Sequence, residues 1–202
     1  MTDDTEKKRL VVGISGASGS VLAIELLKCI KELDQWESHV VVSRGAVLTL
    51  AHEAGKTPSF IAEYADQMYG IDELGANIAS GTFRTEGMVI VPCSMKTVAG
   101  VVTGFSDNLL LRAADVVLKE RRKLVAVARE TPLSTIHLRN MLRLAEAGGV
   151  VMPPVISYYT HPDSLEAVTR QIVGKILNEF GVEVSGFKRW GNQCTTADTP
   201  AA

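Results

Sequence analysis

Three glycines at regular spacing mark the first segment that could do chemistry. Gly13, Gly16 and Gly19 lie in VVGISGASGSV (residues 11–21), after a short apolar run and before a stretch with helical periodicity. A glycine turn between a strand and a helix lets backbone N–H groups approach an anion, and the helix start adds partial positive charge. The segment therefore predicts either a phosphate site or a turn that only packs the helix onto the strand.

The details of this turn disfavour NAD. Ser15 stands where the pattern G-x-G-x-x-G requires its second glycine, and the next predicted strand ends in Ser43 and Arg44 instead of an acidic residue that would hold a ribose. NADP, with Arg44 on its extra phosphate, stays an alternative. Ser15 and Ser18 also lack the G-x-S-x-G elbow, so a hydrolase is not expected.

A second anion-binding segment is expected at PCSMKT (92–97). Ser94 can cap a helix that begins here, and Thr97 lies three residues further on, so two hydroxyls and several free N–H groups could meet one phosphate. An ordinary helix cap would have the same sequence. Beside the glycine turn, a bound phosphate is the better interpretation.

Charged residues that could act on a second phosphate follow later in the chain. Arg112, Asp115 and Lys119 share one face of a predicted helix, which indicates either a solvated stripe of ion pairs or a cationic rim. Arg129 and Glu130 end a buried strand, where the carboxylate could exchange protons or simply pair with the guanidinium.

Short apolar runs alternate with helical patterns, and these elements must position the residues above. Five strands rich in Val and Ile are predicted at 9–15, 39–43, 87–93, 123–129 and 149–155. Strands without polar alternation are typical of parallel sheets covered on both faces. We therefore predict an α/β fold with one doubly wound, mostly parallel sheet (Rossmann/flavodoxin-like) and helices on both faces. The chain is expected to be a single domain over 1–202 with flexible tails at 1–8 and 193–202.

Composition excludes several classes of function. The net charge is -2 and there is no basic stripe, so nucleic acid is not an expected partner. No apolar stretch approaches the roughly 20 residues of a membrane span, and the N-terminus lacks the apolar core of a signal peptide. The scattered cysteines Cys29, Cys93 and Cys194 indicate free thiols in the cytoplasm, and no pair of histidines has metal-ligand spacing.

Five segments in order resemble the UbiX/Pad family of flavin prenyltransferases: GISGASG, ASGTFRTEGMVIVPCSMKT, DNLLLRAADVVLKERR, RETPLSTIHLRNM and VVMPPV. The resemblance covers about residues 9–191. It implies transfer of a dimethylallyl group from dimethylallyl phosphate to N5 and C6 of reduced FMN, without a metal. It also implies that the prenylated FMN serves a UbiD-type decarboxylase, and that the protein forms a homo-oligomer, typically a dodecamer.

The resemblance further implies roles for individual residues. Those expected to contact FMN are Gly16, Ala17, Ser18, Ser43, Ser94, Met95, Lys96, Thr97 and Arg129. Those expected to meet the prenyl phosphate are Ser80, Arg112, Lys119, Arg129, Tyr159 and Lys175. Glu130 would be the acid that helps the phosphate leave, Glu53 a second carboxylate near the prenyl group, and Ser18 an aid to attack by C6.

One departure from the family and two alternative functions follow from the same comparison of motifs. Some members place a tryptophan near the prenyl group where this chain has Leu74, and Trp190 could replace it as an aromatic wall. An FMN-dependent cysteine-type decarboxylase would use a histidine before the third predicted strand, and residues 71–86 contain none. A non-catalytic flavin-binding subunit is the other alternative, against which Glu130 and the cations count.

Overall fold

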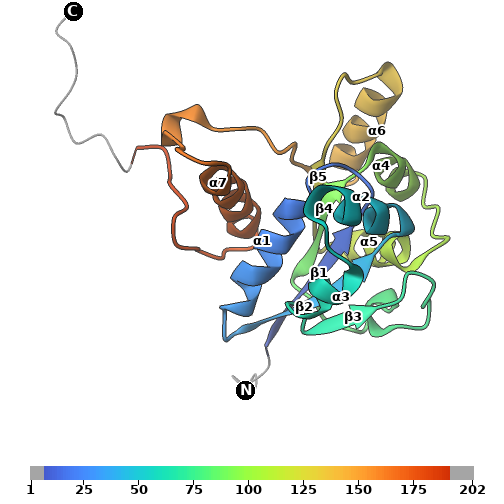
Figure 1. Ribbon diagram of the computed structural model, residues 1–202. Helices are drawn as coiled ribbons and strands as arrows, with labels where there is room; N and C mark the ends of the chain where they lie inside the picture. Colours follow the sequence, from blue (N-terminus) through green and yellow to red (C-terminus); the bar gives the residue numbers. More distant parts are fainter. Residues whose placement is uncertain (1–6, 192–202) are drawn as a thin grey trace, which may run out of the picture.

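Six parallel strands form one sheet in the order β3-β2-β1-β4-β5-β6 (Figure 1). The computed structural model describes residues 7–191. The strands are β1 (Lys8–Ile14), β2 (Trp36–Val42), β3 (Gln67–Tyr69), β4 (Gly87–Cys93), β5 (Lys123–Ala128) and β6 (Val150–Val151). Val12 of β1 lies opposite Val40 of β2 and Val89 of β4. The winding direction reverses between β1 and β4, and a sheet of this kind binds ligands at that point, beyond the carboxyl ends of its strands.

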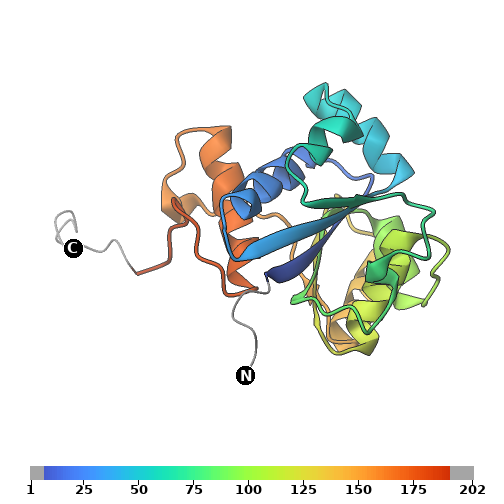
Figure 2. The same cartoon turned by 90° about the horizontal axis from the view of Figure 1, so that it is seen from below.

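The helices cover both faces of the sheet, as Figures 1 and 2 show. They are α1 (Ser20–Lys31), α2 (Arg44–Ala54), α3 (Pro58–Ala62), α4 (Met95–Val102), α5 (Leu109–Lys119), α6 (Thr135–Glu146) and α7 (Leu165–Asn178), with 3-10 turns η1 (Asn77–Ala79) and η2 (Tyr158–Thr160). The first core, on one face, joins the sheet to α1, α2, α3 and α7. The second core, on the opposite face, joins the sheet to α4, α5 and α6. The predicted α/β fold is therefore confirmed.

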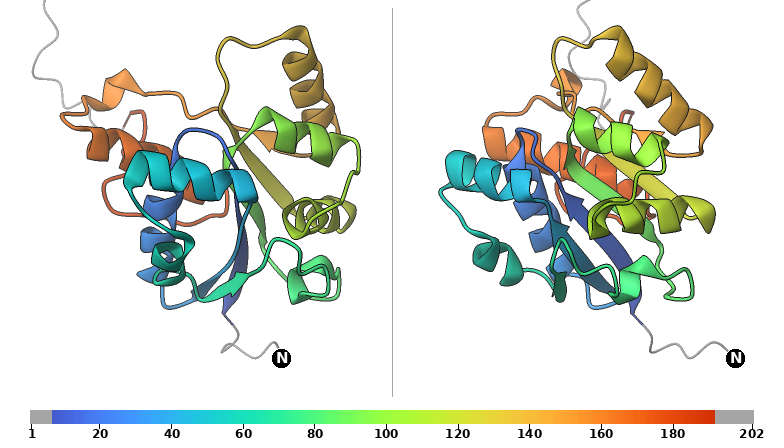
Figure 3. Two further views of the ribbon diagram at one scale, coloured as in Figure 1. Left: turned by 45° about the vertical axis from the view of Figure 1, so that its right-hand side comes forward. Right: turned by 90° about the vertical axis from the view of Figure 1, so that its right-hand side faces the viewer.

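Helix α6 and the segment 152–164 flank the carboxyl ends of the strands. Figure 3 shows α6 rising above α4, and the chain after β6 crossing from there to α7 on the other face. The described helices include none with both the length and the apolarity needed to cross a membrane. Within residues 7–191 the two cysteines, Cys29 and Cys93, are buried and form no disulfide.

The structure differs from the sequence prediction at both edges of the sheet. Strand β3 was not expected, and β6 pairs only at Val150 and Val151 instead of over 149–155. Pro153 and Pro154 follow and have no N–H to donate to a neighbouring strand, which ends the pairing. Strand β1 already includes Lys8, so the expected flexible tail over 1–8 is wrong at that residue. The expectations for 1–6, 193–202 and Cys194 fall outside the described residues.

Candidate functional site

Hydrogen bonds tie the carboxyl ends of neighbouring strands together. Ser15, just after β1, donates from its N and its Oγ to the carbonyl of Pro92 at 3.2 and 3.0 Å. The same Oγ accepts from the N–H of Ser94 at 2.8 Å. On the other side of β1, the N–H of Ser43 donates to the carbonyl of Ile14 at 2.9 Å. The glycine of a dinucleotide motif could not make the side-chain bonds of Ser15, so this departure from the pattern has a structural role.

A cavity of about 380 Å³ opens at this junction, a size found among small-ligand sites. Its lining includes five of the residues predicted to bind the cofactor: Gly16, Ser43, Ser94, Lys96 and Thr97. Ala17 and Ser18 continue the turn that begins at Gly16. Arg129 is joined to the same edge, because its N–H donates to the carbonyl of Cys93 at 3.0 Å. The structure therefore gathers most of the predicted cofactor residues at one place.

Three helices begin beside this cavity, and the third, α5, is capped by Asn108, whose Oδ1 accepts from the N–H of Leu111 at 3.1 Å. Ser94 caps α4, accepting from the N–H of Thr97 at 3.3 Å and lying 3.0 Å from its hydroxyl. Ser43 caps α2 by accepting from the N–H of Ala46 at 3.2 Å. Helix starts carry partial positive charge, to which the exposed Lys96 adds a full charge, so this side of the cavity suits a phosphate. The side chain of Met95 is buried in the second core, which leaves only its main chain for a ligand.

The glycine turn is shaped by two different constraints. A Cβ on Gly16 would lie 2.8 Å from the carbonyl carbon of Gly45, so the two loops approach each other closely only because both residues are glycine. Gly19 has a φ of 116° at the start of α1, a conformation that disfavours other residues.

The start of α1 already holds an anion, the carboxylate of Glu53. Its Oε2 accepts from the N–H of Gly19 at 3.0 Å and from the N–H and Oγ of Ser20 at 2.9 and 2.7 Å. Burial opposes ionisation, but hydrogen bonds from Ser18, Ser20 and the backbone outweigh it and lower the pKa of Glu53 to about 2. The anion at the glycine turn is thus the protein's own, and the start of α4 is the candidate place for an external phosphate.

The residues proposed for NADP and for proton transfer are also located. Arg44 pairs with Asp72, its Nη2 lying 3.0 and 2.8 Å from the two carboxylate oxygens, so the cation that the NADP alternative needs is already engaged.

Arg129 and Glu130 are exposed at the carboxyl end of β5. A carboxylate oxygen of Glu130 accepts from the N–H of Thr131 at 3.0 Å.

Apart from Arg129 at the carboxyl end of β5, the residues predicted for the prenyl phosphate form two groups on opposite faces of the sheet. Arg112 and Lys119 lie on α5 with Ser80 beside them, and they pair with Asp115 and Glu120. On the other face, Lys175 of α7 pairs with Glu179 at 2.6 Å. Tyr159 is exposed in η2, where its ring meets that of Trp190 with centroids 5.1 Å apart. One chain alone does not bring the two groups together.

The sequence analysis missed seven residues that line the cavity: Gly45, Ile71, Asp72, Asp107, Asn108, Leu110 and Leu111. Ile71 and Asp72 follow β3, whose existence would have been the signal. Ile71, Leu110 and Leu111 contribute apolar atoms to the lining, beside the polar side chains of Asp72, Asp107 and Asn108. Among residues 7–191, no group of three His, Cys, Asp or Glu side chains is arranged to hold a metal ion. The cavity can therefore bind a molecule with a phosphate at one end and an apolar or planar group at the other.

Comparison with known proteins identifies the family. The chain matches the family model described as Flavoprotein over residues 1–180. It is 46% identical over 182 residues to a probable UbiX-like flavin prenyltransferase of Sedimentibacter hydroxybenzoicus, covering 90% of this chain and 96% of that relative. It is also 46% identical over 183 residues to the flavin prenyltransferase LpdB of Lactiplantibacillus plantarum, covering 91% and 98% of the two chains.

Solved structures agree with these relatives. AnUbiX, crystallised with FMN and dimethylallyl pyrophosphate, superposes with a TM-score of 0.89 at 45% identity, covering 92% of this chain and 98% of its own. A dodecameric FMN-dependent UbiX-like decarboxylase from Escherichia coli O157:H7 gives 0.88 at 44% identity, covering 90% and 98%. The peptidyl-cysteine decarboxylase EpiD, at 19% identity and a TM-score of 0.56, shares the fold alone. The chain belongs to the family of UbiX-like flavin prenyltransferases.

Proposed function

We propose that this flavin prenyltransferase joins the dimethylallyl group of dimethylallyl phosphate to N5 and C6 of reduced FMN. The observation that carries the proposal is the cavity between β1 and β4, where the starts of α2, α4 and α5 meet and apolar side chains form part of the lining. The flavin prenyltransferase names of the relatives and the two ligands of AnUbiX support the same reaction. The cysteine decarboxylases share only the fold, so no observation favours that alternative.

The residues present fit the phosphate of FMN. The main-chain N–H groups at the start of α4, the hydroxyls of Ser94 and Thr97, and the ammonium of Lys96 bind it in this proposal. Ser43, Arg129 and the turn over Gly16, Ala17 and Ser18 contact the rest of the molecule. Reduced FMN supplies the nucleophilic N5 and C6 atoms.

The donor needs groups that stabilise its departing phosphate. As the allylic carbon–oxygen bond breaks, negative charge accumulates on the phosphate, and fixed cations lower the energy of that state. We assign this role to a set of cations and hydroxyls: Ser80, Arg112, Lys119, Arg129, Tyr159 and Lys175. Glu130 gives a proton to the leaving oxygen.

Glu53 has a different part from Glu130 in this proposal. With a pKa of about 2 it is ionised at neutral pH, so it stabilises positive charge on the prenyl group instead of donating a proton. Its hydrogen bond from Ser18 orients that hydroxyl, which assists the attack by C6.

Assembly of several copies follows from the two separated groups of donor residues. Because α5 and α7 cover opposite faces of the sheet, we propose that Arg112 and Lys119 of one copy meet Tyr159 and Lys175 of a neighbour. Apolar side chains available for such contacts are exposed on α6 and after β6: Ile136, Leu138, Leu142, Val155 and Tyr158. The dodecameric relative from Escherichia coli supports a homo-oligomer of this kind, and we propose a dodecamer.

Two further parts of the proposal concern the cell. The prenylated FMN serves a UbiD-type decarboxylase, which receives it as a cofactor that this chain only makes. The buried thiols of Cys29 and Cys93 are consistent with a cytoplasmic location, because cysteines stay reduced there.

The test is anaerobic incubation with reduced FMN and dimethylallyl phosphate, without added metal, followed by mass spectrometry of the released flavin. The expected result is a mass increase of one C5H8 unit. A parallel reaction with the diphosphate shows which donor is used. Unmodified FMN from both reactions, with FMN shown to bind, would refute the proposal and leave a flavin-binding subunit as the better interpretation.

A further inference from the structure

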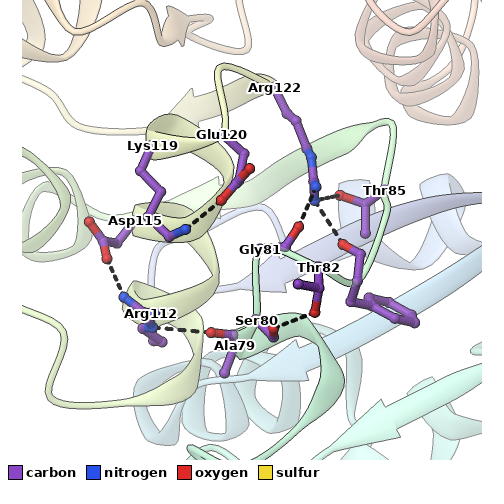
Figure 4. Close-up of polar contacts among 11 residues, drawn as sticks. Ala79, Ser80, Gly81, Thr82, Thr85, Arg112, Asp115, Lys119, Glu120 and Arg122 are labelled. Atoms are coloured by element: carbon purple, nitrogen blue, oxygen red, sulfur yellow. Dashed lines mark hydrogen bonds and ion pairs between the residues drawn. The ribbon is translucent and has the colours of Figure 1, made fainter.

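The segment 79–85 lies along α5 and carries Ser80 between two cations (Figure 4). On one side of Ser80, the carbonyl of Ala79 accepts from Nε of Arg112 at 3.2 Å. On the other side, a Cβ on Gly81 would lie 2.8 Å from Nζ of Lys119. Ser80 is itself exposed, and its hydroxyl is 2.9 Å from that of Thr82. The position of Ser80 relative to Arg112 and Lys119 therefore depends on what holds this segment.

Arg122, between α5 and β5, makes more of these holding contacts than any other side chain drawn in Figure 4. Its Nη2 donates to the carbonyl of Gly81 at 2.6 Å, and its Nη1 donates to the carbonyl of Phe83 at 2.8 Å. Nη1 also lies 3.4 Å from the hydroxyl of Thr85. A rigid planar guanidinium reaches acceptors on three alternate residues in a way that a lysine ammonium, with one nitrogen, does not.

The fit of the segment against α5 leaves no spare room. A Cβ on Gly81 would lie 2.1 Å from Oε1 of Glu120, the partner of Lys119. The ring of Phe83 packs under the guanidinium of Arg9 at 4.8 Å and against the ring of His39 at 5.1 Å. Phe83 thus anchors the far end of the segment in the sheet, while Arg122 fixes the part nearest to Ser80.

We propose that Arg122 is a positioning residue, which holds Ser80 in line with Arg112 and Lys119 so that the three bind the donor phosphate as one unit. This inference rests on the proposed function, in which those three residues meet the donor. The N–H groups of Arg122 bind the segment 79–85, and in this inference Arg122 contacts neither the prenyl donor nor the flavin. It acts at the amino ends of β4 and β5, whereas the cavity assigned to FMN lies at their carboxyl ends.

Because Arg122 is far from the cavity assigned to FMN, a positioning role and a merely structural role should affect donor KM and FMN affinity differently. Loss of the contacts would release Ser80 and weaken donor binding in both the ground state and the transition state, which raises KM more than it lowers kcat. FMN affinity would stay unchanged because its cavity is at the other end of the strands. A merely structural role would change FMN affinity and donor KM together.

The experiment measures donor KM, kcat and FMN affinity for Arg122→Gln, Arg122→Lys and Gly81→Ala. Arg84→Gln is the matched control, because Arg84 is exposed in the same segment and has no hydrogen bond or ion pair within residues 7–191. We expect both Arg122 variants to raise the donor KM about tenfold or more, with FMN affinity and the control within about twofold of wild type. Arg122→Lys should not restore the donor KM, because lysine keeps the positive charge but lacks the two terminal nitrogens with which the guanidinium reaches Gly81 and Phe83.

Gly81→Ala tests the same idea with Arg122 intact, since the new methyl group must displace Glu120 or the segment, and it decides the matter if the Arg122 variants do not fold. We expect its donor KM to rise as well. An unchanged donor KM in the folded variants, or an equal loss of FMN affinity, would overturn the inference. A wild-type protein that makes no prenylated FMN would instead overturn the proposed function on which the inference rests.

Discussion

Replacing Glu53 by Gln should destabilise the protein at neutral pH and much less in acid. The substitution keeps the shape of the side chain and one acceptor oxygen, but it removes the negative charge that faces the start of α1. That charge accepts hydrogen bonds from the N–H groups of Gly19 and Ser20 and from the Ser20 hydroxyl. The pKa of Glu53 falls from its ordinary 4.5 to about 2.

The magnitude follows from that pKa. A fall from 4.5 to about 2 corresponds to about 3.4 kcal/mol at most. Because the Glu53 side chain is exposed, solvent screening reduces this contribution to about 1–2 kcal/mol. A group whose pKa is lower in the folded state stabilises the protein above its unfolded pKa and loses that effect as the pH falls. The contribution of Glu53 is therefore complete above about pH 5 and falls below half by about pH 3.

The assay is urea unfolding of wild type and Glu53→Gln at pH 7 and pH 3, with Glu63→Gln as the control. Glu63 is exposed near the end of α3 and forms no side-chain hydrogen bond or ion pair within the described part of the chain. We expect the difference in unfolding free energy between wild type and Glu53→Gln to be less than half as large at pH 3 as at pH 7. Glu63→Gln should have the unfolding free energy of wild type at both pH values. A difference in unfolding free energy that does not change with pH, or one that is as large for Glu63→Gln, would refute the argument that the start of α1 lowers the pKa of Glu53.

Three further predictions concern the site and the assembly. Glu130→Gln should lower prenyl transfer by about 10²-fold or more while FMN affinity is retained, and a native rate in single-turnover mass spectrometry would remove Glu130 from the mechanism. Gly16→Ala should weaken FMN binding at least about tenfold in a fluorescence titration, because its Cβ would meet the backbone of Gly45, whereas Gly75→Ala has no atom within 4 Å to meet and should be neutral. Leu142→Glu places a charge on an α6 side chain that is 59% exposed, and sedimentation should show a smaller oligomer; an unchanged sedimentation coefficient would exclude this part of α6 from the interfaces.

The buried strands could be predicted from sequence because apolar side chains identify them directly. The segment 87–93 was expected as a strand and forms β4 over the same residues, all of them buried. Strand β3 has only three residues, and one of them, Gln67, is exposed, so hydrophobic pattern could not distinguish it from a loop. Its absence from the prediction also concealed Ile71 and Asp72, which line the cavity because they follow this strand.

The helix caps of the site were predictable because they are local, whereas its long-range contacts were not. Ser94 and Thr97 are three residues apart, and their spacing indicated the cap that the structure contains. Glu53 is 34 residues from Gly19, and no spacing in the sequence connects them. Arg122 was missed for another reason: two of its acceptors are backbone carbonyls, which every residue carries, so no side-chain pattern indicates them.

The cations proposed for the donor share one more property, which bears on how a phosphate enters. Arg112, Lys119 and Lys175 each pair with a carboxylate close by in sequence, so the phosphate must replace a partner on every one of them. These pairs are partly exposed, and ion pairs at such positions contribute only about 0–1 kcal/mol each. A dianion that contacts several of the cations at once gains more than any single carboxylate does, because its charge is shared among them. In the proposed function, these weak pairs hold the cations near their binding positions, and the donor phosphate displaces the carboxylates when it binds.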